Sequence, residues 1–175
     1  GGDTTPYPNE SRILYCQDNV LYPKTMVEVL NIVSLFDSDN SIWGSTGFNI
    51  SNMHIRIEKA HGTPVEVIEA YGGVIARVGT FLPDFTYYIQ SIKEENILVF
   101  RESSDIIISN YLSKHKHIKK IVNLTNKKYS FDDIWANMSL CEESSTLCRS
   151  SMWEVHKDVI YILAGWKELY IQMTI

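Results

Sequence analysis

Hydrophobic residues fall in short runs along this chain, and polar residues and turn formers separate them. Short apolar runs bounded by Asp, Asn, Gly or Ser predict β-strands. The first run, Ile13–Cys16, is followed by amide and acid side chains, as a buried parallel strand is. Strand character recurs at 41–44, at 53–58, in two pieces across 65–76, at 96–100, at 118–124 and, as an edge strand, at 169–175.

Longer segments with helical spacing alternate with these runs. Residues 24–36 follow Pro23, which suits the first turn of a helix, and their mostly apolar side chains predict packing on a sheet. Further helices are expected at 80–92, from Ser104 onward, at 131–140 and at 152–163. Alternating strands and helices predict the α/β class.

Gln17-Asp18-Asn19 follows the first predicted strand. Open α/β sheets bind ligands beyond the carboxyl ends of their strands, so Asp18 is placed to hold a divalent cation against a diphosphate. The alternative is a turn that uses Asp and Asn for local hydrogen bonds.

Three stretches, in order along the chain, resemble nucleotide-sugar glycosyltransferases of the GT-A fold (family 2-like), similar to small glycosyltransferase domains of large DNA viruses and bacteria. Cys16–Pro23 resembles the metal-binding segment, usually Asp-x-Asp or three Asp followed by Tyr-Pro or Pro. Val65–Val74 resembles the glycine-bearing segment on the acceptor side. Ser104–Leu112 resembles the acidic helix start, usually Asp-Asp or Glu-Asp before apolar residues.

The resemblance implies that residues 1–175 form a single GT-A-like (Rossmann-like) α/β domain, a mixed sheet flanked by helices. A complete domain of this kind places a βαβ half ahead of the metal-binding segment, where most contacts to the nucleotide base and ribose lie. That half is missing from this sequence, so we expect a fragment or a part of a longer natural chain.

The activity implied is transfer of a sugar from a nucleoside diphosphate sugar, a UDP-sugar foremost, to a hydroxyl of a glycan acceptor, with inversion. Mn²⁺ or Mg²⁺ would assist, held by Asp18, the only acid that both alignments of the metal-binding segment keep. Cys16, or Gln17 and Asn19, replace its usual partners.

Asp105 is the expected catalytic base, because it matches the second acid of the usual pair. An inverting transferase needs a carboxylate that takes the proton of the attacking hydroxyl. Ser104 replaces the first acid. The alternative duty of Asp105 is to stabilise the start of a helix, which Ser103 or Ser104 would cap.

Four residues are expected to bind substrate. Gly72 and Gly73 interrupt a strand pattern, which indicates either a close backbone approach to the sugar or a plain bend. Glu69, just before them, is placed to bond a sugar hydroxyl. Trp43 offers an aromatic face to a sugar, or else belongs to the core.

Composition narrows the function further. A net charge of −5 opposes general binding to nucleic acid or anionic membrane, and no apolar run reaches membrane-spanning length. The three cysteines lack metal-site spacing and fit reduced thiols in the cytoplasm.

Two functions other than glycosyl transfer stay open. One is a scaffold or binding module that has lost catalysis, which the replaced acids favour. The other is a nucleotidyltransferase, which should carry more carboxylates and a phosphate-binding loop.

Overall fold

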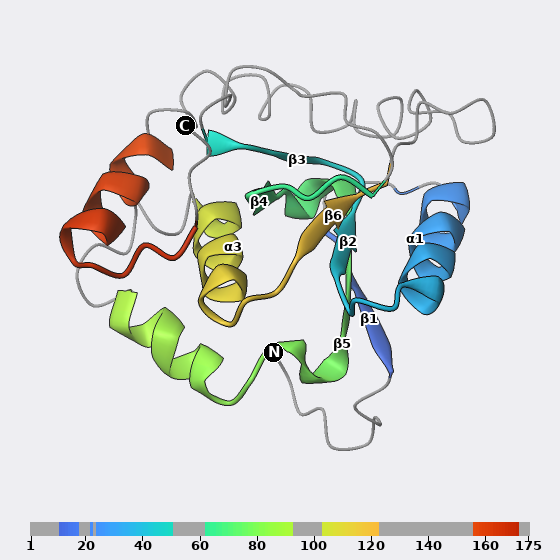
Figure 1. Ribbon diagram of the computed structural model, residues 1–175, viewed down its shortest axis with the longest axis horizontal. Coiled ribbons are helices and arrows are strands. Elements are labelled where there is room, and N and C mark those ends of the chain that lie inside the picture. The colour runs from blue at the N-terminus through green and yellow to red at the C-terminus, as the bar shows by residue number, and fades with distance from the viewer. Residues whose placement is uncertain are drawn as a thin grey trace.

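A mixed four-stranded sheet forms the centre of the protein. The computed structural model describes residues 11–17, 22, 24–50, 62–92, 103–122 and 156–171. The strands are β1 (Arg12–Tyr15), β2 (Ile42–Gly44), β5 (Val74–Arg77) and β6 (Lys119–Ile121), in the order β1-β5-β2-β6 (Figure 1). β5 runs antiparallel to both β1 and β2, whereas β6 runs parallel to β2. The strands β1, β2 and β6 therefore all point the same way.

A second, smaller sheet extends from the first. β3 (Gly47–Phe48) follows β2 directly and pairs antiparallel with β4 (Val67–Ile68). A 3₁₀ turn, η2 (Ala70–Gly72), then leads from β4 into β5, and another, η3 (Val78–Thr80), follows β5.

Helices lie on both sides of the main sheet (Figure 1). Helix α1 (Lys24–Phe36) packs on β2 and β5, whereas α3 (Ser104–Lys114) packs against β4. Residues 84–92 and 156–165 are also helical, on the α3 side. Within the described segments, no helix has the length and apolar character that a membrane span requires.

The core is divided by the sheet, because successive side chains of a strand point to opposite faces. In β5, Ile75 packs under α1, while its neighbours Val74 and Ala76 face the α3 side. The cluster under α1 contains Met26, Val29, Leu30, Trp43, Ile75 and Val122. The larger cluster on the other face includes Ile42, Ile106, Ile107, Tyr111, Leu112, Val159 and Leu163.

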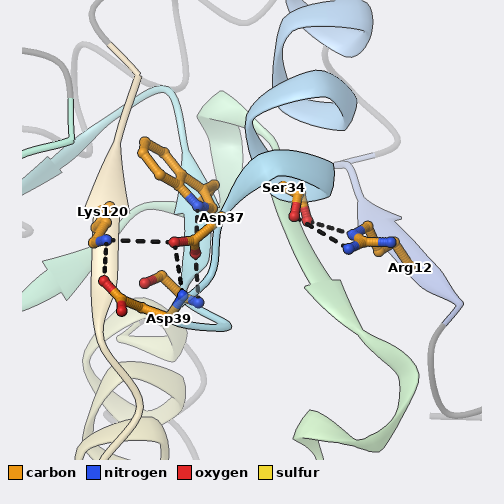
Figure 2. A network of polar contacts seen from close by, with 7 residues as sticks. Arg12, Ser34, Asp37, Asp39 and Lys120 are labelled. Atoms are coloured by element: carbon orange, nitrogen blue, oxygen red, sulfur yellow. Dashed lines mark hydrogen bonds and ion pairs between the residues drawn. The ribbon is translucent and has the colours of Figure 1, made fainter.

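A carboxylate ends α1 and joins three elements. Asp37 Oδ2 accepts hydrogen bonds from the backbone N–H of Ser41 at 2.7 Å and from Trp43 Nε1 at 2.9 Å. Lys120, on β6, reaches both Asp37 at 3.5 Å and Asp39 at 3.1 Å (Figure 2). Figure 2 also shows Arg12 of β1 bonded to Ser34 of α1, through Nε to Oγ at 2.8 Å. These polar contacts fix α1 to the sheet.

The described helices and strands confirm the α/β class and most of the helices and strands predicted for these residues. The predicted helix at 24–36 coincides with α1, and the strands at 13–16, 41–44 and 118–124 correspond to β1, β2 and β6. The expectation that the first of these is a buried parallel strand is wrong. β1 lies at the end of the sheet order, is half-buried to exposed, and pairs antiparallel with β5. The predicted strand at 53–58, the strand at 96–100 and the helix at 131–140 lie outside the described residues.

The edge strand predicted at 169–175 is wrong over its described part. Residues 169–171 form no strand, because Asn110 of α3 holds them by other bonds. Its Oδ1 accepts the N–H of Tyr170 at 2.7 Å and of Ile171 at 3.3 Å, and its Nδ2 donates to the carbonyl of Glu168 at 2.8 Å. Asn110 is fully buried, so α3 anchors the end of the described chain through one polar side chain.

Candidate active site at the carboxyl edge of the sheet

The carboxyl ends of β1, β2 and β6 meet at one edge of the main sheet. Tyr15 and Gly44 both pair with Val74, the first residue of antiparallel β5, so β5 begins where β1 and β2 end. This edge therefore carries Cys16 and Gln17 after β1, Ser45 and Thr46 after β2, and η2 just before β5. Ligands of open α/β sheets bind at such an edge.

The segment from Glu69 to Gly73 crosses this edge as a single tight turn. The Glu69 N–H donates to the carbonyl of Thr46 at 3.0 Å. The Gly73 N–H closes η2 by donating to the carbonyl of Ala70 at 3.0 Å. The turn is thus tied to the end of β2 at one point and to itself at another.

Asp105 contacts this turn from α3. Its Oδ1 accepts the backbone N–H of Ala70 at 3.0 Å, and Ser109 Oγ, one helical turn on, accepts the N–H of Ile68 at 3.0 Å. Burial raises the pKa of Asp105 to about 6, although the bond from Ala70 acts in the opposite direction. A carboxyl with such a pKa can exchange a proton near neutral pH.

The structure therefore brings together four of the predicted site residues: Asp105, Glu69, Gly72 and Gly73. It explains both glycines without a ligand. A Cβ on Gly72 would collide with the hydroxyls of Ser45 and Thr46, and Ser45 Oγ donates to the Gly72 carbonyl at 2.5 Å. Gly73 has φ of +82°, which a residue with a Cβ rarely adopts. The two glycines therefore form the bend that was one of the two alternatives, and their contact with a sugar stays a prediction.

The prediction that Trp43 stacks on a sugar is wrong. Its side chain lies under α1, where the residue is only 5% exposed, and its Nε1 is bonded to Asp37. Its position in β2 turns it toward the α1 face of the sheet, so its indole belongs to the core.

The proposed metal ligand, Asp18, lies outside the described residues. Immediately before it in the sequence, Cys16 and Gln17 are exposed at the end of β1, and the Gln17 N–H donates to the hydroxyl of Tyr22 at 3.1 Å. Across the described part of the chain, no three His, Cys, Asp or Glu side chains gather closely enough to hold a metal ion.

Sequence reasoning missed two pairs of residues, one at this edge and one at the start of α3. Ser45 and Thr46 follow a predicted strand directly, so the rule that singled out Asp18 would have found them too. Thr46 Oγ1 is buried and makes no hydrogen bond.

The second pair is Ser103, which precedes α3, and His156, which begins the helix at 156–165. Ser103 Oγ and His156 Nδ1 are hydrogen-bonded at 2.5 Å. Their separation in the chain left no signal in the sequence.

Comparison with known proteins found no relative of this chain: no family model, curated protein or solved structure matches it.

Proposed function

We propose that this chain forms the acceptor side of a glycosyltransferase active site, which transfers a sugar from a nucleoside diphosphate sugar to a hydroxyl acceptor. The position and environment of Asp105 carry the proposal. It lies at the carboxyl edge of the sheet, beside the turn that begins β5, and burial raises its pKa to about 6. A general base works best when its pKa is near the working pH.

In the proposed reaction, the acceptor oxygen attacks the anomeric carbon of the donor sugar. The bond from that carbon to the diphosphate oxygen breaks, and its electron pair leaves with the diphosphate. The acceptor proton passes to Asp105. Because Oδ1 already accepts the Ala70 N–H, Oδ2 is the atom assigned to the proton. Attack on the side opposite the leaving group inverts the anomeric centre.

Glu69 is assigned to the acceptor, through a hydrogen bond from a sugar hydroxyl. Asp18 is assigned to Mn²⁺ or Mg²⁺, because these ions prefer oxygen ligands. When bound, such an ion offsets the negative charge that develops on the leaving diphosphate. A UDP-sugar is the first donor to test and a glycan the first acceptor.

A second candidate is a binding or scaffold module that keeps the fold without catalysis. It is favoured by the Ala70 contact, which gives Asp105 a purely structural duty in joining α3 to η2. The exposed Cys16 and Gln17, where the resembled family has acids, favour it as well.

One substitution separates the two candidates. Asp105→Asn retains an oxygen that can accept the Ala70 N–H but cannot take a proton from the acceptor. Sugar transfer should fall by roughly 10²–10⁴-fold, while nucleotide affinity stays unchanged. Transfer is measured on the 175-residue chain with Mn²⁺, a UDP-sugar and a glycan acceptor.

Asp158→Asn is the matched control, because it makes the same change at an exposed position of the helix at 156–165. Undiminished transfer by Asp105→Asn would remove the base from the mechanism. Donor binding by the wild type without transfer to any acceptor would favour the scaffold.

A further inference from the structure

The amino-terminal end of α3 is held from outside the helix. Ser103 is its N-cap residue, yet the Ser103 side chain makes no capping bond within α3. Its hydroxyl instead bonds His156 Nδ1 at 2.5 Å, and Ser103 is fully buried. A favourable local cap has thus been replaced by a contact with a distant helix.

His156 also contacts the small sheet. Its ring stacks on Phe48, at the end of β3, with 5.9 Å between ring centroids and 29° between ring planes. The residue is 8% exposed, and burial lowers the pKa of His156 to about 4, so the ring is neutral at physiological pH. One side chain therefore holds the start of α3 and the end of β3 in a fixed relation.

Asp105 lies two residues after Ser103, in the first turn of the same helix. We propose that His156 is a positioning residue for Asp105: by holding Ser103, it fixes the first turn of α3 and keeps the Asp105 carboxyl against the Ala70 N–H. That Asp105 acts as a base rests on the proposed function, whereas its placement does not.

Two substitutions test the contact from its two sides. His156→Phe keeps a ring of similar size for stacking on Phe48 but removes the nitrogen that bonds Ser103. Ser103→Ala removes the hydroxyl and leaves the His156 ring in place. His156→Asn restores a hydrogen-bonding group near the position of Nδ1 and serves as the rescue.

The readout is the titration of the Asp105 carboxyl, followed by ¹³C NMR in the 175-residue chain, with hydrogen exchange of the Ala70 amide. If the first turn of α3 loosens, water reaches the carboxyl and its desolvation is relieved. The Asp105 midpoint should then fall by about one pH unit in His156→Phe and in Ser103→Ala. Exchange at Ala70 should accelerate, and His156→Asn should recover part of both changes.

Val159→Ala is the control, because Val159 is fully buried in the same helix and its side chain is apolar. It should lower stability without moving the Asp105 midpoint. The proposal is overturned if Ser103→Ala leaves the midpoint unchanged, or if Val159→Ala moves it as far as Ser103→Ala does. A midpoint that moves in a chain without transfer activity supports the positioning and counts against the proposed function alone.

Discussion

Asp105 Oδ1 accepts the backbone N–H of Ala70 at 3.0 Å, and this bond joins the first turn of α3 to the turn that precedes β5. The two residues are far apart in sequence, yet their contact sets the local chemistry of the edge. The bond stabilises the ionised carboxylate, whereas burial destabilises it more, and the net effect is the pKa of about 6.

This balance predicts how stability depends on pH. Between pH 4 and 6 the unfolded chain loses the Asp105 proton while the folded protein keeps it, so this group lowers the free energy of unfolding as the pH rises. Asp105→Asn removes that decline. Relative to wild type, the variant should gain up to about 3 kcal/mol between pH 4 and pH 7. Urea unfolding at several pH values measures the free energy of unfolding of the variant minus that of wild type. If this difference falls or stays constant from pH 4 to pH 7, the raised pKa is contradicted.

Asp37 should show the opposite dependence. Burial by itself would raise its pKa, but hydrogen bonds from Trp43, Ser41 and Asp39 outweigh it and lower the pKa of Asp37 to about 2. The ionised group therefore stabilises the fold above pH 4, and this contribution is lost as the pH falls toward 2. Asp37→Ala should cost about 2–3 kcal/mol at pH 7 and much less at pH 2. Asp158→Ala, at an exposed position outside this polar network, is the control for acid unfolding curves.

Gly72 should be intolerant of any side chain. Gly72→Ala places a methyl group against the Ser45 and Thr46 hydroxyls and should cost about 1–3 kcal/mol. Adding Thr46→Ala should recover part of the loss, because it removes one of the two colliding hydroxyls. Gly165→Ala is the matched control: nothing lies near its Cβ position, and alanine there should stabilise the helix by about 0.5–1 kcal/mol. Thermal melting of the three variants tests the order of stabilities.

Asn110 should be among the most sensitive polar residues. Asn110→Leu keeps much of the volume but leaves the N–H groups of Tyr170 and Ile171 and the Glu168 carbonyl without their partner. The expected cost is about 2–4 kcal/mol, with faster hydrogen exchange at Tyr170 and Ile171. Asn31→Leu, on the exposed face of α1, should stay within about 0.5 kcal/mol of wild type.

Asp18 is tested through ligand binding. Mn²⁺ together with a nucleoside diphosphate should raise the thermal midpoint, because a ligand that binds only the folded state stabilises it. Asp18→Ala should abolish the rise, and Cys16→Ala should preserve it, since a thiol is a poor ligand for this ion. A rise that survives Asp18→Ala would exclude Asp18 as the metal ligand.

Local patterns in the sequence predicted the elements, because α1, β1, β2 and β6 each carry their signal within a few residues. The helix at 24–36 needed only its apolar face and the preceding proline. The role of Trp43 was not predictable in the same way, since an indole that stacks on a sugar and one that packs under α1 have the same local sequence. What distinguishes the two roles is the position of the indole under α1 and its hydrogen bond to Asp37, and both depend on how α1 packs on the sheet.

The candidate site was predictable only in part. Asp105, Glu69 and the glycines were found from a resemblance, and the sheet brings them to one edge. Their mutual contacts could not be found, because the Asp105–Ala70 and Ser103–His156 bonds depend on how two helices pack against a turn. The position of Thr46 after a strand was visible in the sequence, but the burial of its hydroxyl without a hydrogen-bond partner was not, since burial of an individual atom is a tertiary property.

The place of β5 between β1 and β2 has a consequence for synthesis. As the ribosome releases the chain, β1, α1 and β2 emerge in succession, but β1 and β2 do not pair with each other. Arg12 must wait for Arg77, and Ile42 must wait for Lys119 as well. Such long-range pairing slows folding, because the entropy of closing a long loop is lost before the contacts that offset it can form. Trp43 can pack on α1 once β2 has emerged, but Ile75 cannot complete this cluster until β5 has left the exit tunnel, so part of the apolar face of α1 stays exposed during synthesis.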